Sequence, residues 1–136
     1  MMFEFFIQTK KRQECVSLVD KINGLLKESG VDQGLCNIFV HHTTAALTIL
    51  ESADPNIHGD LFIAWNKAVP QHAGYAHDKK DNNAQSHILG AMVGPSETLP
   101  LRDGKLDLGT WQDLVLVELD GPRERKVSIT ILRDEE

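Results

Sequence analysis

Short hydrophobic runs separated by polar turns divide most of the chain into segments of strand length. Each of these runs predicts a β-strand, and they occupy residues 3–9, 34–41, 46–50, 99–101, 106–108, 114–119 and 126–132. The Asp-Gly pair at residues 103–104, between two of the runs, is typical of a tight hairpin. The pattern therefore predicts about six to eight short strands.

Three other segments have the hydrophobic spacing of helices. Residues 12–29 place apolar side chains three or four positions apart, and Gly30 is a plausible end for such a helix. A second helix is expected to begin at Asp54 and Pro55, since aspartate can cap a helix and proline is tolerated in its first turn. A third, shorter helix is expected over residues 84–92.

The order of these elements predicts the fold class. Helices fall early and strands late, which argues against a regular alternation of strands and helices in a parallel sheet. We therefore expect an α+β fold, mainly an antiparallel two-sheet β-sandwich-like core with two or three helices. The 136 residues contain no linker, repeat or low-complexity stretch, so a single domain over residues 1–136 is expected.

Composition and charge narrow the possible partners. The net charge of −6 makes binding to nucleic-acid phosphates unfavourable. The longest apolar stretches fall far below the roughly 20 residues of a membrane span, and the first residues lack the pattern of a signal peptide. The two cysteines suit reduced thiols. We expect a cytoplasmic protein with no nucleic-acid partner and no membrane partner.

Histidines are the first candidates for chemistry. His42 follows a predicted strand, and His77 and His87 flank the end of a long polar loop at residues 71–83. Neutral imidazoles from separate segments can form an open metal site. The alternative, that each histidine is an ordinary solvated or hydrogen-bonded residue, is favoured by spacing alone, because the chain has no HExxH or comparable motif.

Carboxylates and one unusual tetrapeptide offer further candidates. Glu51 closes an apolar strand, where partial burial would raise its pKa and suit proton transfer, although an exposed strand end is an equal alternative. Asp54 is either a base or simply a helix cap. In the Gly-Thr-Trp-Gln segment at residues 109–112, polar side chains could bind a ligand and the tryptophan could line a pocket, or the segment could be a plain turn. The chain contains no phosphate loop, GxGxxG or GxSxG motif.

Three spaced motifs change this balance. Residues 96–114 read SxxLPLxxGxxxxGTWQxL, residues 42–45 read HTTA before Glu51 and an Asp-Pro pair, and residues 75–87 contain YxH and then DxNAxxH. In this order they resemble the YjbQ-like family, whose members are described as secondary thiamine-phosphate synthases. The resemblance extends over about residues 5–131. Leu50 and Ser52 depart from it, standing where the family usually has asparagines.

The resemblance implies a set of site residues. It implies a metal held by His42, His77 and His87, with zinc or another transition metal as the divalent cofactor, because imidazole suits these ions better than Mg²⁺. The polar positions that we assign to catalysis are Glu51, Asp54 and Asp81. Those assigned to substrate binding are Thr43, Thr44, Asn83, Thr110, Trp111 and Gln112.

The resemblance also implies an activity and an assembly. The activity is the joining of hydroxymethylpyrimidine diphosphate to a thiazole phosphate with release of diphosphate. The alternatives are a metal-dependent hydrolase of a small phosphorylated metabolite, with Glu51 or Asp54 as base, and a non-catalytic module that binds a metal or metabolite. The assembly is a homotrimer with pockets near the subunit boundaries, for which the apolar strands at residues 114–119 and 127–132 would supply contact surface. We also expect a positive φ at Gly109 and the Trp111 ring as a wall of a pocket or interface.

Overall fold

Two antiparallel sheets form the framework of the computed structural model, which describes residues 1–135. The larger sheet has five strands, in the order β1 (Met2–Gln8), β8 (Glu124–Arg133), β3 (Gly34–Val40), β5 (Ser96–Arg102) and β6 (Lys105–Leu106). The smaller sheet has three, in the order β2 (Glu14–Ser17), β7 (Gln112–Glu118) and β4 (Ala45–Glu51). The expected α+β fold with two antiparallel sheets is confirmed.

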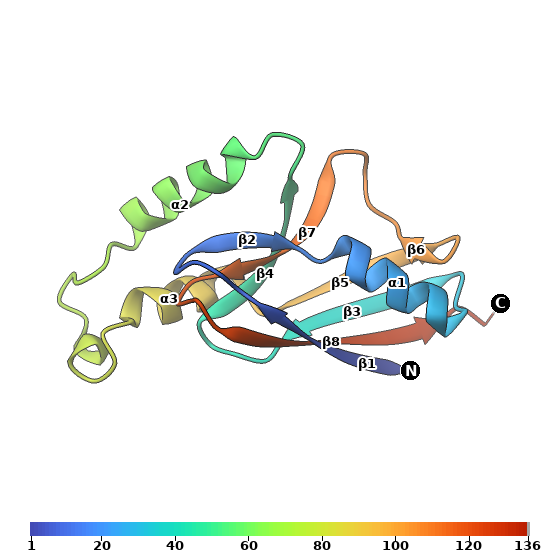
Figure 1. Cartoon of the computed structure of the whole chain (residues 1–136), viewed down its shortest axis with the longest axis horizontal. Helices are drawn as coiled ribbons and strands as arrows, with labels where there is room; N and C mark the ends of the chain where they lie inside the picture. The colour runs from blue at the N-terminus through green and yellow to red at the C-terminus, as the bar shows by residue number, and fades with distance from the viewer. Residues whose placement is uncertain (136) are drawn as a thin grey trace.

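Helices lie on both sides of the smaller sheet (Figure 1). Helix α1 (Val19–Ser29) shares the main core with both sheets, whereas α3 (Ala84–Val93) packs against the opposite face of β4. Helix α2 (Asn56–Ala68) has no buried residue, and in Figure 1 it projects away from the sheets. A short 3₁₀ turn, η1 (Ala76–Lys79), interrupts the polar loop before α3. None of the helices in residues 1–135 is long and apolar enough to cross a membrane.

The hydrophobic core has two parts, one on each face of β7. Leu114 and Leu116 belong to the larger part, with α1 and the five-stranded sheet. Val115 and Val117 belong to the smaller part, which includes Leu89 of α3. Because successive side chains of a strand point to opposite faces, an uninterrupted apolar run is what a strand covered on both faces requires.

Most of the expected element positions are confirmed, including both turns that were tied to glycine. Gly30 ends α1 with a φ of +74°, in the left-handed region that favours glycine at this place. Asp103 and Gly104 have φ values of +53° and +76°, as a tight hairpin of type I′ needs. The helices expected from residue 54 and over residues 84–92 are present as α2 and α3.

The expected helix over residues 12–29 is wrong in its first third. Residues Glu14–Ser17 form strand β2 instead and pair with β7, with Ser17 opposite Val115. Pairing with a central strand outweighs the helical spacing of this short segment, because spacing and propensity are weak local preferences. Only Val19–Ser29 forms the helix.

The idea that the late strands leave surplus apolar surface is also wrong. Strand β7 is the middle strand of its sheet, and β8 lies between β1 and β3. Their apolar side chains are almost all in the core, and Leu132 is the exposed exception. The other exposed large hydrophobic side chains of the five-stranded sheet belong to β1 and β3: Met2, Phe6, Leu35 and Phe39.

Candidate functional site

His42 lies in the turn between β3 and β4, where its ring is held from one side. Its Nδ1 accepts a hydrogen bond from the backbone N–H of Thr44, at 3.1 Å, and lies 3.0 Å from the Thr44 hydroxyl. Thr44 is itself fully buried. The His42 ring is therefore held, through its contacts with Thr44, against the interior of the protein.

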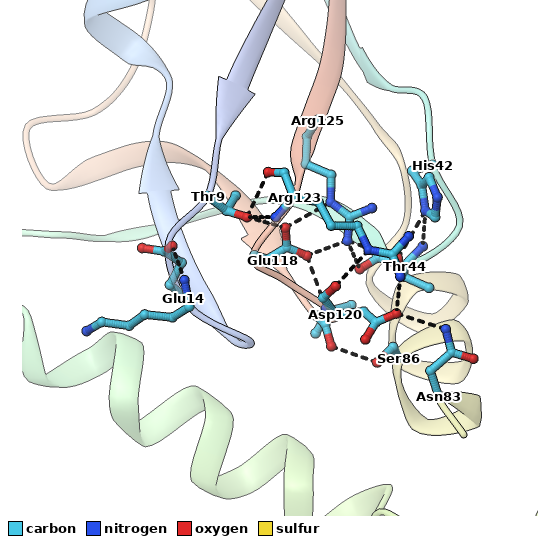
Figure 2. A network of polar contacts seen from close by, with 12 residues as sticks. Thr9, Glu14, His42, Thr44, Asn83, Ser86, Glu118, Asp120, Arg123 and Arg125 are labelled. Atoms are coloured by element: carbon cyan, nitrogen blue, oxygen red, sulfur yellow. Dashed lines mark hydrogen bonds and ion pairs between the residues drawn. The ribbon is translucent and has the colours of Figure 1, made fainter. Parts of the chain in front are cut away.

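A buried ion pair lies directly behind Thr44 (Figure 2). The side chains of Arg125 and Glu118 have no exposed surface. Arg125 donates from Nε to Glu118 Oε1 at 2.9 Å, and its Nη2 donates to the second carboxylate oxygen and to the Thr44 hydroxyl and carbonyl oxygens. Thr9 from the end of β1 donates to Glu118 Oε1 at 2.6 Å. The network thus connects β1, β7, β8 and the β3–β4 turn.

A second, more exposed network lies beside the first. The Asp120 carboxylate accepts hydrogen bonds from Arg123 Nη2 at 2.7 Å and from Asn83 Nδ2 at 2.8 Å, as Figure 2 shows. The Arg123 side chain remains 43% exposed. Asn83 Oδ1 is buried and has no hydrogen-bond partner among residues 1–135. This network joins the β7–β8 turn to the start of α3.

The other two predicted metal-binding histidines meet edge to face. The rings of His77 in η1 and His87 in α3 have centroids 4.7 Å apart. His77 Nε2 lies 3.6 Å from Asp81 Oδ2. Since His87 lies one helical turn after Asn83, these side chains and the Arg123 network border the same region.

Two adjoining pockets share His42 and His87. One, of about 490 Å³, is lined by His42, Asp81, Asn83, His87, Asp120 and Arg123. The other, of about 560 Å³, lies on the apolar side, with Phe39, Val40, Ala45, Ala91 and Pro95 among its lining residues. We refer to them as the polar pocket and the apolar pocket. Thr43 also lines the apolar pocket.

The charges around His42 favour its neutral form. Partial burial lowers its pKa from the usual value, and the nearby guanidinium groups of Arg125 and Arg123 lower it further. In Glu118, burial by itself would raise the pKa, but hydrogen bonds from Arg125, Thr9 and the Asp120 N–H outweigh burial, so the pKa is lowered. At neutral pH the site therefore combines a neutral His42 with an ionised Glu118.

The remaining predicted residues lie at the opposite end of the smaller sheet. Glu51 pairs with Gln112, whereas the other end of the same two strands pairs Ala45 with Glu118. A strand rises by about 3.3 Å per residue, so the two ends are about 20 Å apart. Within one chain, the fold does not bring Glu51 and Gln112 to the histidines. Asp54 and Thr110 belong to this distant end as well, and Asp54, one residue before the N-cap Pro55 of α2, accepts the Asn56 N–H at its Oδ1.

The positive φ expected at Gly109 is wrong, although a turn does begin there, with the Gln112 N–H donating to the Gly109 carbonyl oxygen at 3.1 Å. Gly109 is not among the residues with positive φ. Its N–H instead donates to Gln112 Oε1 at 2.8 Å, and an added Cβ would meet that flexible side chain first, at 3.1 Å. Trp111 is 66% exposed, so in a single chain it is a surface residue.

The sequence analysis missed the residues that organise the site: Glu118, Asp120, Arg123 and Arg125. One signal was available, since Glu118 is a carboxylate inside the apolar run at residues 114–119. A charge in a strand covered on both faces needs a partner. Arg123 and Arg125, which follow Glu118 closely in the chain, were the cations available to pair with it.

The side chains do not fit the expected three-histidine metal centre. A metal would need a lone pair from His42, but the Thr44 N–H already occupies that of Nδ1. In addition, among residues 1–135 no group of three or more His, Cys, Asp or Glu side chains is arranged to hold a metal ion. We therefore derive no chemical step through a metal, and the cofactor stays a prediction.

A family model and several related proteins match nearly the whole chain, and all of them belong to one family. The model of the family described as UPF0047 protein YjbQ-like matches residues 3–134. A UPF0047 protein of Methanocaldococcus jannaschii is 38% identical over 134 residues, covering 98% of this chain and 96% of its own. One from Methanothermobacter thermautotrophicus is 36% identical over 128 residues, covering 94% and 89%.

A solved structure is similar over the whole fold. The crystal structure of a YbjQ-like protein of unknown function from Sulfolobus solfataricus has a TM-score of 0.93 at 32% identity, covering 98% of this chain and 97% of its own. The likeness therefore extends over nearly the whole length of both chains. Together with the matched family model and the relatives, it establishes that the chain belongs to the YjbQ-like UPF0047 family.

Proposed function

We propose that the protein binds a small phosphorylated metabolite across the two adjoining pockets and acts on it there. The observation that carries the proposal is the shared wall of His42 and His87, with a polar pocket on one side and an apolar pocket on the other. A phosphorylated heterocycle likewise has an apolar part, its ring, and a polar part, its phosphate. Its ring would suit the apolar pocket, and its phosphate would lie near Arg123.

Arg123 has the chemistry for the phosphate end. Its guanidinium presents several donors in a planar fork that matches phosphate oxygens, and only part of that fork is used by Asp120. The ion pair with Asp120 leaves the arginine side chain partly exposed at the pocket. It also fixes the arginine in place, which reduces the entropy lost when a ligand binds.

The reaction that we propose is the one that the family resemblance implies, thiamine-phosphate synthesis. It joins hydroxymethylpyrimidine diphosphate to a thiazole phosphate and releases diphosphate. The departing diphosphate carries concentrated negative charge, so fixed donors at its position lower the barrier. In this chain Arg123 and His42 would supply them. The zinc or other transition-metal cofactor stays a prediction, to be tested by metal analysis of untagged protein.

Replacing Arg123 with glutamine tests the phosphate site directly. A hydrogen bond to a charged group contributes about 1.5–3 kcal/mol, so the affinity for diphosphate is expected to fall roughly 10- to 100-fold. Isothermal titration calorimetry with sodium diphosphate measures the affinity, and product formation from the two phosphorylated substrates measures the activity. Arg102→Gln is the matched control, because Arg102 forms an exposed pair with Asp107 and neither residue lines the polar or the apolar pocket. Equal affinities in the two variants would contradict the proposal.

We also propose that the chain forms a homotrimer in which a neighbouring copy lies next to the pockets. The outer face of the five-stranded sheet carries exposed apolar side chains, among them Phe6, Leu35 and Leu132. Phe39 is half-exposed on the same face and also lines the apolar pocket. A second copy covering this face would therefore help to close that pocket, as apolar patches of this kind indicate.

Light scattering tests the assembly. We expect a mass of three times the 15.2 kDa of one chain, falling to that of one chain when Leu35 and Leu132 are both replaced with lysine. The control is Ile63→Lys, a similarly exposed position on α2, which should leave the mass unchanged. A wild-type protein with the mass of a single chain would refute the proposal.

A further inference from the structure

The nitrogen atoms of His42 have different surroundings, and this difference limits what the ring can do. On one side, Nδ1 faces the Thr44 N–H, at 3.1 Å. A backbone N–H is always a donor, so Nδ1 must be the acceptor and cannot carry a proton in this arrangement. A neutral imidazole has one N–H, and here it must be on Nε2. The other hydrogen-bond contact of the His42 side chain in residues 1–135, with the Thr44 hydroxyl, is also at Nδ1, so Nε2 has no partner among these residues.

The buried arginine reinforces this assignment through Thr44. Arg125 Nη2 donates to the Thr44 hydroxyl oxygen at 2.9 Å, which leaves the hydroxyl hydrogen to be donated elsewhere. Nδ1 of His42 is the acceptor within reach, at 3.0 Å. The direction of donation therefore runs from Arg125 to Thr44 and then to His42. Glu118 holds the guanidinium in the required orientation.

We propose that His42 is held as a neutral Nε2–H hydrogen-bond donor to an anionic oxygen of the ligand, that it is not a metal ligand, and that Thr44 and Arg125 are the residues that position it. The ligand part of this inference rests on the proposed function. The assignment of the tautomer does not depend on the proposed function, because it follows from contacts inside the chain.

The location of the ring explains why a donor is useful there. His42 lines both pockets, so a donor on Nε2 lies where the ring of the proposed ligand would meet its phosphate. A neutral donor can stabilise a developing negative charge without losing its own proton. The pKa of His42, lowered by burial and by the two arginines, is consistent with this neutral role. Arg123 supplies the full positive charge on the polar side.

The first test needs no ligand. Long-range ¹H–¹⁵N correlation spectra of the ¹⁵N-labelled protein at pH 8 distinguish protonated from unprotonated ring nitrogens, and the His42→Gln spectrum identifies the His42 signals. We expect an unprotonated Nδ1 and a protonated Nε2. Thr44→Val loses the hydroxyl but keeps the backbone N–H, so Nδ1 should stay unprotonated while its ¹⁵N signal moves because one of its two donors is lost. Thr44→Ser should retain the wild-type pattern. A wild-type Nδ1–H tautomer, or an unaltered spectrum in Thr44→Val, would overturn the respective part of the proposal.

The second test separates a donor from a metal ligand. A glutamine amide nitrogen can replace an Nε2–H donor, but glutamine is a poor zinc ligand. For His42→Gln we expect diphosphate affinity close to wild type, with a roughly tenfold loss in His42→Ala, as one hydrogen bond to a charged ligand predicts. Zn²⁺ alone should bind equally to wild type, His42→Gln and the control His58→Gln. A large loss of Zn²⁺ affinity in His42→Gln only would show that His42 is a metal ligand and overturn the inference. If wild type does not bind diphosphate, the proposed function fails while the tautomer result still stands.

Discussion

Replacing Glu118 with glutamine is expected to lower the free energy of unfolding by about 3–5 kcal/mol. The carboxylate is fully buried and is the only acidic group among residues 1–135 that is hydrogen-bonded to Arg125. The variant leaves the arginine charge buried with a neutral partner, and an uncompensated charge in a protein interior is strongly unfavourable. Chemical denaturation followed by tryptophan fluorescence measures the change.

An exposed ion pair provides the control for this prediction. Lys126 and Glu4 pair across β1 and β8 at 3.4 Å, with both side chains partly exposed. Glu4→Gln should therefore cost only about 0–1 kcal/mol. The double variant Glu118→Leu with Arg125→Met removes both charges and should recover much of the stability. If Glu118→Gln and Glu4→Gln have equal effects, the buried pair does not contribute as we argue.

The same pair predicts the response to acid. The folded-state pKa of Glu118 is lower than its usual value of 4.5. A carboxyl group with a lowered pKa stabilises the fold above the unfolded-state pKa, and that stability is lost as the pH falls through the folded-state value. The wild type should thus lose stability steeply below about pH 4.5, and the Glu118→Gln variant should lose less over that range, relative to its own stability at pH 7.

The fold was largely predictable because a hydrophobic run in the sequence forms a strand wherever its side chains pack into the core. The runs at residues 114–119 and 126–132 become β7 and β8, which are both interior strands of their sheets. Strand β7 packs against the core on both faces, and β8 contributes to the larger core from one face. Segment Glu14–Ser17 was not predictable in the same way. It is four residues long, and its conformation is decided by pairing with β7, a partner about 100 positions away in the sequence.

The motifs predicted which histidines lie near one another, but not the hydrogen bonds that each ring forms. The His77 and His87 rings meet because a short 3₁₀ turn leads directly into α3. His42 joins them through the fold, and its place beside His87 was expected from the motifs. The hydrogen bond from the Thr44 N–H to His42 Nδ1 was not expected, because a sequence gives no sign of which ring nitrogen a backbone N–H will face.

The motifs assign Glu51, Gln112 and His42 to one site, but the fold places them at two ends of the smaller sheet. Glu51 and Gln112 share one end, and His42 lies next to the other. Sequence motifs carry no information about whether two segments serve the same pocket or different surfaces. If the homotrimer forms as proposed, the distant end of one chain is available to approach the pockets of another, which would bring both sets of residues to one site.

Gly90→Ala is expected to destabilise the protein even though alanine is the better helix former. An added Cβ at Gly90 would lie 2.5 Å from the Thr43 carbonyl oxygen, a backbone atom that cannot move alone. Overpacking of this kind costs about 1–3 kcal/mol, against a gain of up to about 1 kcal/mol from helix propensity. Thermal and chemical denaturation should therefore show a net loss of stability.

Gly59→Ala is the matched comparison, because it makes the same change in helix α2 with no atom within 4 Å of the new Cβ. That variant should be stabilised by about 0.5–1 kcal/mol, so the two substitutions should differ in sign. Gly90→Ala should also weaken diphosphate binding, since it pushes α3, which carries His87 and begins after its N-cap Asn83, away from the turn that carries His42. If both variants gain stability and bind diphosphate equally well, close packing of α3 against that turn does not set the geometry of the pockets.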